Sequence, residues 1–200
     1  MKRKKQNVYL FVDGSNLYAG QYELFGPDKY LNFPEFIKAV EKSLGVKFSK
    51  IYFYASYSPQ PKKLTKKQKL YLKNEALFYR SVKKTRKTTF FRGYRSKTSG
   101  KEKEVDVKLA VDMVDFAHLK KHDKIFIISG DADFMGALHV VKRLKIPASV
   151  LCLENKIMFK ALLFYPTFIL LFKRKEVRIA KIRKKPVYIK IDRRKVVKQI

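Results

Sequence analysis

Apolar runs alternate with helical patterns along most of this chain, and this alternation restricts the fold more than any other feature. Residues 8–12 form an unbroken apolar run, which is typical of a strand covered on both faces. Similar runs predict four more strands, at residues 50–55, 88–94, 124–129 and 148–153. Strands that alternate with helices indicate βαβ units around a parallel sheet, so we predict an α/β fold.

Helices are predicted between these strands from apolar spacing and from capping signals. The clearest spans 33–44, where Asn32 is a candidate cap, Pro34 falls in the first turn and Gly45 follows the end. Another is expected to begin near Asn16 or Leu17, after the first strand. Further segments read as helices at 64–84, 105–119 and 134–144, and as a core helix followed by a core strand at 157–172.

The length of 200 residues favours one domain, and the last segment differs in character from the rest. We place the domain at residues 1–172 and a basic C-terminal extension at 173–200. Two forms of the extension remain open. It is either a hairpin added to the core or a basic arm that orders only on a polyanion.

The charge balance indicates a polyanionic partner. The chain has 47 Lys and Arg against 17 Asp and Glu, a formal charge of +30. Such an excess destabilises a compact state by self-repulsion unless a polyanion or counterions screen it, and nucleic acid is the commonest such partner. The alternative is a general lysine enrichment that serves solubility alone. The grouping of the basic residues favours nucleic acid.

Cysteine usage and hydropathy bear on the cellular setting. Cys152 is the single cysteine, so neither an intrachain disulfide nor a cysteine-based metal site is expected, which favours a reducing cytoplasm. The apolar stretch 157–172 is interrupted by Lys160 and Pro166 and is shorter than the roughly 20 residues of a membrane span. The run 8–12 is too short for the core of a signal peptide. No membrane association is predicted.

Acidic residues follow two of the predicted strands. Asp13 ends the first apolar run, and Asp131 and Asp133 follow the strand 124–129. The functional crevice of an open parallel sheet lies beyond the carboxyl ends of its strands, so these aspartates are expected at one edge. Each could instead merely cap the following helix. The three together, with glycines beside them, favour a site.

The helix at 105–119 supplies further acidic candidates. Asp106 is expected on the inward stripe of this helix, where a carboxylate is costly unless it meets a cation or strong donors. Asp112 is a weaker candidate that could reach the site from the flank. The companions of Asp106 on the predicted stripe are Leu109, Ala110, Met113 and Ala117.

A divalent cation would reconcile these carboxylates with one another. Asp13, Asp106, Asp131 and Asp133 would repel each other strongly unless a hard cation such as Mg²⁺ or Mn²⁺ sat among them. Such a cation can activate water for phosphodiester cleavage. Competing chemistries lack their residues: the three histidines are scattered, no base accompanies Ser129, and no phosphate-binding loop with a Lys-Ser or Lys-Thr pair is present.

Three motifs, taken in order, resemble the NYN domain, and most closely its LabA-like branch within the PIN-like nuclease superfamily. They are Phe-Val-Asp-Gly-Ser-Asn-Leu-Tyr at 11–18, Glu-Val-Asp-Val-Lys-Leu-Ala-Val-Asp at 104–112, and Ile-Ser-Gly-Asp-Ala-Asp-Phe at 128–134. The resemblance covers about residues 6–172. The chain departs from the family in having Glu104 where glycine is frequent, and in the extension at 173–200.

The resemblance implies a PIN-like, Rossmann-like fold: a three-layer α/β/α sandwich with a central, mostly parallel sheet. It also implies metal-dependent endoribonuclease activity, with Mg²⁺ or Mn²⁺ as cofactor. By matching motif, Asn16 would orient a water, the metal or a phosphate, and Ser129 would be a supporting polar contact. The metal-facing acids would be Asp13, Asp106, Asp131 and Asp133.

Basic residues interleaved with aromatics suggest where RNA would lie, since single strands are held by stacking and phosphate neutralisation. Phe90 and Phe91 are expected in the core, and the loop before the 105–119 helix could fold over substrate. The predicted RNA-binding residues are Lys66, Lys73, Arg92, Tyr94, Arg95 and Lys97.

The prediction is therefore a metal-dependent endoribonuclease acting on single-stranded or structured RNA. A non-catalytic RNA-binding module of the same fold is the alternative. DNA is a less favoured partner than RNA, and a homodimer is left open.

Overall fold

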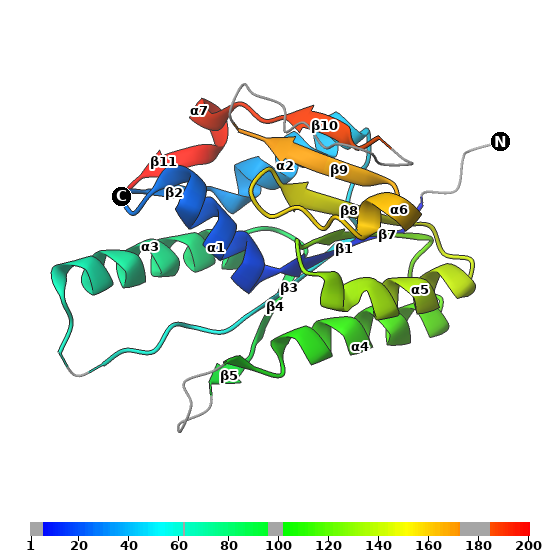
Figure 1. The fold of residues 1–200 in the computed structure, drawn as a ribbon, viewed down its shortest axis with the longest axis horizontal. Coiled ribbons are helices and arrows are strands. Elements are labelled where there is room, and N and C mark those ends of the chain that lie inside the picture. Colours follow the sequence, from blue (N-terminus) through cyan, green and yellow to red (C-terminus); the bar gives the residue numbers. More distant parts are fainter. Residues whose placement is uncertain (1–5, 62, 96–101, 173–184) are drawn as a thin grey trace.

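The computed structural model describes residues 6–61, 63–95, 102–172 and 185–200. A seven-stranded sheet runs through the middle of this part of the chain (Figure 1), and every neighbouring pair of its strands is parallel. In spatial order its strands are β10 (Val187–Lys190), β9 (Thr167–Leu171), β8 (Ala148–Leu153), β7 (Lys124–Ile128), β1 (Val8–Asp13), β3 (Lys50–Ala55) and β4 (Thr88–Arg92).

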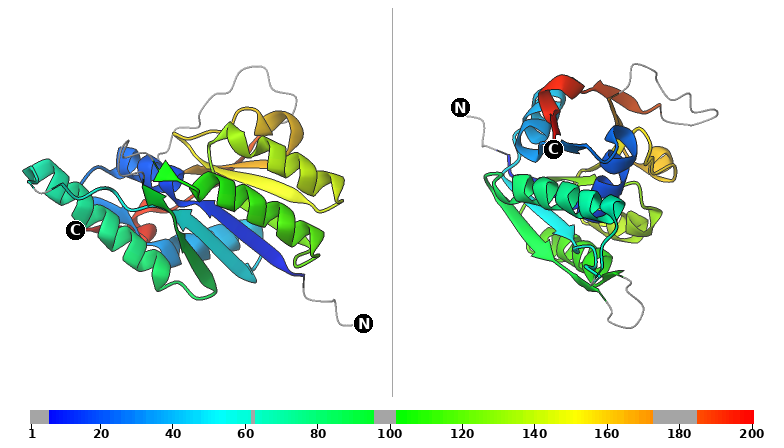
Figure 2. Two further views of the ribbon diagram at one scale, coloured as in Figure 1. Left: turned by 90° about the horizontal axis from the view of Figure 1, so that it is seen from below. Right: turned by 90° about the vertical axis from the view of Figure 1, so that its left-hand side faces the viewer.

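Helices cover both faces of the sheet, which confirms the three-layer α/β/α prediction (Figure 2). Strand β1 shows why its run is apolar throughout: Leu10 and Val12 belong to one core, whereas Tyr9 and Phe11 belong to the other. The first core is closed by α1 (Gly14–Phe25), α2 (Phe33–Leu44) and α3 (Lys66–Lys83), and the second by α4 (Val105–His118) and α5 (Met135–Arg143).

Local signals placed several elements accurately. Helix α2 has the predicted bounds: the Asn32 side chain accepts from Glu35 N, and Gly45 follows the end in the left-handed conformation at φ 64°. Helix α1 begins at Gly14, two residues earlier than expected, because the Asp13 side chain caps it. The 157–172 segment forms α6 (Ala161–Phe164) and β9, as a helix followed by a strand. None of the described helices is long and apolar enough to cross a membrane.

The predicted strand at 88–94 divides in two. Strand β4 ends at Arg92, and Gly93 N donates to Ala55 O at 3.0 Å. The chain then leaves the main sheet as β5 (Tyr94–Arg95), which pairs with β6 (Glu102–Lys103). The rings of Phe90 and Phe91 pack against the two cores, as predicted.

The described part of the C-terminal extension joins two different sheets. Strand β10 adds to the main sheet parallel to β9, so it does not form a hairpin with β11 (Val197–Gln199). Strand β11 instead pairs antiparallel with β2 (Lys29–Leu31), after the short helix α7 (Arg193–Val196). Residues 173–184 lie outside the described part.

The strand order fixes where a site can form. Strand β1 lies between β7 and β3, so the chain extends the sheet in one direction from β1 through β3 and β4, and in the other through β7 to β10. Ligands of open parallel sheets bind at such a switch point, beyond the carboxyl ends of the strands. Here those ends are Asp13 and the residues that follow Ile128.

Candidate metal and nucleic-acid site

Asp13 occupies the centre of the switch point. It is the last residue of β1, is 3% exposed, and caps α1 by accepting from Asn16 N at 3.0 Å with Oδ1. Its other oxygen, Oδ2, accepts from Ser129 Oγ at 2.7 Å. The side chain therefore joins the ends of two neighbouring strands and is fixed in position at both oxygens.

The loop after β7 is fastened to the same point. Gly130 N donates to Asn16 Oδ1 at 3.0 Å, and Asp131 N donates to Ser129 Oγ at 3.0 Å. The loop also runs close to the chain after β8, because a Cβ at Gly130 would lie 2.4 Å from Lys156 O. Asn16 and Ser129, predicted as polar partners of the site, thus hold Asp13 and the 129–131 loop together.

Asp131 and Asp133 differ in their positions. Asp131 is partly exposed and caps the single turn η1 (Ala132–Phe134), accepting from Asp133 N at 2.9 Å. The Asp133 side chain is exposed, and its hydrogen bond to the site is made by its backbone. Asp131 therefore lies in the hydrogen-bonded loop beside Asp13, whereas the side chain of Asp133 points to solvent. Of the two, Asp131 is the better placed to contact a metal.

Burial raises the pKa of Asp13 from its ordinary value of 3.8 to about 7. The hydrogen bonds from Asn16 and Ser129 oppose this rise, while the negative charges of Asp106 and Asp131 add to it. These two carboxylates therefore lie close enough to Asp13 to repel it. A cation bound beside these carboxylates would favour the ionised form of Asp13, because it would oppose both the effect of burial and the two negative charges.

This shift makes stability depend on pH. Between about pH 4 and pH 7 the folded protein keeps the Asp13 proton that the unfolded chain has lost, so the free energy of unfolding falls as pH rises. In the Asp13→Asn variant the side chain at this position does not titrate, so it causes no such fall in the free energy of unfolding. We expect its advantage over the wild type to grow across this window by up to about 1.4 kcal/mol per pH unit. Urea unfolding of both proteins in EDTA at several pH values measures the difference, and a difference that stays constant with pH would contradict the expectation.

Asp106 does not lie on the inward stripe of α4, contrary to the prediction. Its side chain is exposed, whereas Val105, directly before it, is 1% exposed. Helix α4 starts at Val105, as predicted, after Glu104 in the left-handed conformation at φ 70°, and Asp106 lies exposed in its first turn. The buried residues of α4 are Val105, Leu109, Asp112, Met113 and Ala117.

Asp112 is the buried acid of this helix. Its Oδ2 accepts from Tyr54 Oη at 2.9 Å, and its Oδ1 pairs with Lys108 Nζ at 2.5 Å. Both oxygens are therefore engaged within the protein, and the lysine offsets the charge. This arrangement fits a residue that holds α4 against the end of β3.

The carboxylate oxygens of the site are donors of the kind that Mg²⁺ or Mn²⁺ takes, although the described residues do not form a complete cage. Among the residues that the structure describes, no three His, Cys, Asp or Glu side chains are grouped to hold a metal by themselves. Mg²⁺ commonly keeps several waters and takes one or two carboxylates together with substrate phosphates. Asp13 with Asp131, and Asp106 nearby, could supply that number of oxygens.

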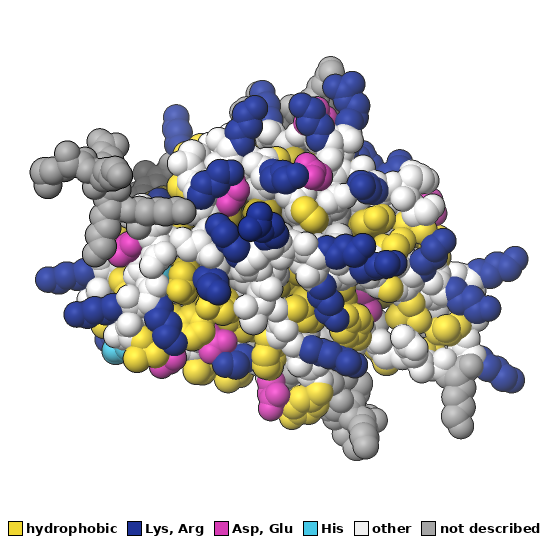
Figure 3. Space-filling view, turned by 180° about the vertical axis from the view of Figure 1, so that it is seen from behind, with side chains coloured by type: hydrophobic (Ala, Val, Ile, Leu, Met, Phe, Trp, Pro, Cys, Tyr) yellow, Lys and Arg dark blue, Asp and Glu magenta, His cyan; other side chains and the backbone are white. Residues whose placement is uncertain are grey.

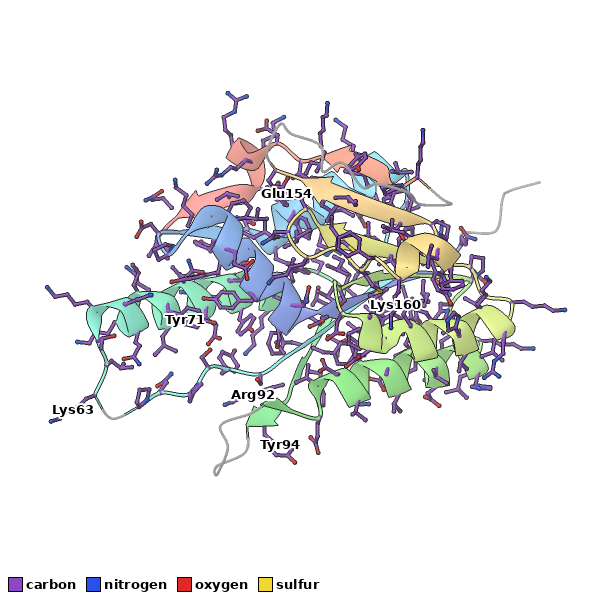
Figure 4. All side chains as sticks on the ribbon, in the orientation of Figure 1. Lys63, Tyr71, Arg92, Tyr94, Glu154 and Lys160 are labelled. Carbon is purple, nitrogen blue, oxygen red and sulfur yellow. The ribbon has the colours of Figure 1, made fainter. Side chains whose placement is uncertain are left out.

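The predicted RNA-binding residues fall into two groups. Lys66 and Lys73 are exposed on the half of α3 that projects beyond the sheet (Figure 1). Arg92 ends β4, and Tyr94 follows it at the start of β5 (Figure 4). Because β1, β3 and β4 are parallel, this is the edge at which Asp13 ends β1. The side chain of Arg95 and all of Lys97 lie outside the described part, as does most of the loop before α4.

Sequence reasoning missed the chain after β3. Arg92 lies over the ring of Tyr57, 4.9 Å from its centroid, and residues 57–60 form one wall of a groove at this edge. The sequence did offer a signal for this wall: the segment Tyr-Ser-Pro-Gln-Pro at 57–61, which closely follows the strand predicted at 50–55. Figure 3 shows Lys and Arg side chains scattered over one face of the protein, with acidic side chains and hydrophobic patches between them.

Comparison with known proteins agrees with this fold and these motifs. A protein of unknown function from Vibrio parahaemolyticus has a similar solved structure, with a TM-score of 0.59 and 13% identity over 98% of this chain and 99% of that chain. At this identity the likeness shows the fold alone. No curated protein matches the chain significantly.

The NYN domain model matches residues 7–169, a range that holds all three motifs and both strand ends of the site. NYN domains form part of the PIN-like nuclease superfamily, which supports a nuclease role in general. The chain belongs to the NYN domain family.

Proposed function

We propose that this protein is a divalent-metal-dependent endoribonuclease of the LabA-like branch, with Mg²⁺ or Mn²⁺ as its cofactor. The observation that carries the proposal is Asp13, a buried carboxylate fixed by Asn16 and Ser129 at the switch point of the sheet. Its pKa is raised to about 7 by burial, with Asp106 and Asp131 adding to the rise. A structural cap alone has no need of two further carboxylates nearby.

The site residues have two roles: some fix the position of Asp13, and others offer carboxylate oxygens to a metal. Ser129 and Asn16 fix the Asp13 carboxylate and the 129–131 loop, so the geometry is set before substrate arrives. Asp131 and Asp106 present oxygens on the more open side of the site. A bound divalent cation would supply positive charge at the scissile phosphate and lower the pKa of the attacking water.

Two features favour RNA as the substrate: the carboxylate site and the positive charge of the chain. The chain has a formal charge of +30, while Asp106 and Asp131 lie close enough to Asp13 for their charges to act on it. The basic surface would hold the phosphate backbone, while the carboxylates act on one phosphodiester. The alternative, a non-catalytic RNA-binding module, is favoured by the absence of a three-residue metal group in the described residues.

A cleavage assay separates the two functions. The purified full chain is incubated with an end-labelled RNA oligonucleotide or its DNA counterpart, in Mg²⁺, Mn²⁺ or EDTA. We expect internal cleavage of the RNA only with a divalent cation, and much less cleavage of the DNA. Tight RNA binding without cleavage in either metal would overturn the enzyme proposal in favour of the binding module. Preferential cleavage of DNA would overturn the choice of substrate.

A further inference from the structure

A groove of about 700 Å³ lies on the same edge of the sheet as Asp13, beside the site rather than in it. Asp13 is in register with Tyr54 of β3, and Tyr54 is in register with Phe91 of β4. Neighbouring strands are about 4.8 Å apart, so the end of β4 lies roughly 10 Å from Asp13 along this edge. The groove is lined by Tyr57, Ser58, Pro59, Gln60, Arg92, Gly93 and Tyr94.

The groove presents flat side chains of the kind that stack on nucleobases. The Arg92 guanidinium lies 4.9 Å from the centroid of the Tyr57 ring, in cation–π geometry, and so it is already oriented. Tyr94 is 56% exposed, one of the large aromatic side chains that the protein leaves open to solvent. Unpaired bases of RNA are held by stacking on aromatic rings and arginine planes.

The wall formed by residues 57–60 is fixed by a buried acid. Glu75 of α3 is 3% exposed and accepts from Ser58 N at 3.1 and 3.2 Å and from Ser58 Oγ at 2.7 Å. On the opposite side, Gly93 N donates to Ala55 O at 3.0 Å and fixes the turn between Arg92 and Tyr94. The groove is thus formed before any ligand binds, which lowers the cost of ordering it.

We propose that this groove binds one unpaired nucleobase of the RNA, stacked against Tyr94 and Arg92, next to the phosphate held at Asp13. The inference rests on the proposed function and adds to it a requirement for substrate: the nucleotide beside the cleaved bond must be single-stranded. A base within a duplex is stacked between its neighbours and cannot enter a groove of this kind.

The test measures binding rather than cleavage. Fluorescence anisotropy in EDTA compares a fluorescein-labelled single-stranded RNA with the same oligonucleotide made of abasic nucleotides, using the full chain. We expect Tyr94→Ala to weaken binding of the normal RNA about tenfold, the effect of losing one stacked base. Tyr94→Phe, which keeps the ring, should stay within about twofold of the wild type. The abasic oligonucleotide should bind the wild type and Tyr94→Ala equally.

Phe164→Ala is the matched control. Phe164 is 45% exposed, but it lies beside the first residues of β7 and β8, at the opposite edge of the sheet. Its replacement should leave binding of both oligonucleotides unchanged. Equal loss of affinity for normal and abasic RNA in Tyr94→Ala, or no loss at all, would overturn the base-binding proposal.

The two proposals can fail separately. RNA cleavage by the wild type, combined with unaltered binding by Tyr94→Ala, would leave the nuclease standing and remove the base-binding groove. Base-dependent binding without cleavage in any metal would support the groove and remove the nuclease.

Discussion

Replacing Asp13 with asparagine is expected to lower the rate of RNA cleavage by about a thousandfold while leaving the protein folded. The change removes the central negative charge of the site, and losses of this size are typical when one catalytic or charge-stabilising group is removed. The hydrogen-bond geometry can be retained, because the amide oxygen still accepts from Asn16 N and the amide nitrogen can donate to Ser129 Oγ. The raised pKa of Asp13 predicts equal or greater stability of the variant at neutral pH. Single-turnover cleavage and thermal unfolding measure both effects.

A second aspartate on the surface provides the control for this experiment. Asp115 is exposed on α4, and Asp115→Asn changes the net charge by the same amount outside the site. It should cleave RNA at nearly the wild-type rate. Equal rates for wild type, Asp115→Asn and Asp13→Asn would mean that Asp13 takes no part in the reaction. A variant at Asp13 that fails to fold would contradict the expected gain in stability.

The elements best predicted from the sequence are those with both local and packing signals. Helix α2 has a capping asparagine, a proline in its first turn and a glycine after its end, and its buried residues Phe33, Phe36, Ile37 and Val40 follow helical spacing. These signals agree, so the bounds are accurate. The pairing of β11 with β2 has no such signal, because it joins segments more than 160 residues apart whose contact depends on the completed fold.

The site was predictable to the extent that it depends on strand ends. Parallel strands bring Asp13 and Asp131 to one edge wherever their helices pack. The inward side of α4 was not predictable in the same way. The helix begins at Val105, as predicted, but its buried stripe runs through Val105, Leu109 and Asp112, so the sequence pattern alone placed the stripe one position out. The wall of the groove at 57–60 depends on the contact between Ser58 and Glu75, residues that are distant in sequence.

The second large effect is expected at Gly14, where alanine should lower the free energy of unfolding by about 3 kcal/mol, the upper part of the range for overpacked cores. A Cβ at this position would lie 2.2 Å from Phe53 Cε1 and 2.7 Å from Tyr54 O. The Phe53 ring is fully buried, and the carbonyl belongs to the backbone of β3, so neither can move without disturbing the sheet. For a chain of this size, the melting temperature should fall by about 6–12 °C.

Gly136→Ala should raise the free energy of unfolding instead of lowering it. The comparison separates the effect of crowding at Gly14 from a general effect of replacing glycine. Gly136 lies in α5, and a Cβ there would meet nothing within 4 Å. Alanine is favoured over glycine in a helix by about 1 kcal/mol, so this variant should melt a few degrees higher than the wild type.

Gly14→Ala should also impair RNA cleavage. Gly14 follows Asp13, which we place at the centre of the site, and the added Cβ should displace the junction between β1 and α1. Unchanged melting of Gly14→Ala would mean that β1 and β3 are not packed as closely as this junction requires, and the position assigned to Asp13 would then be wrong.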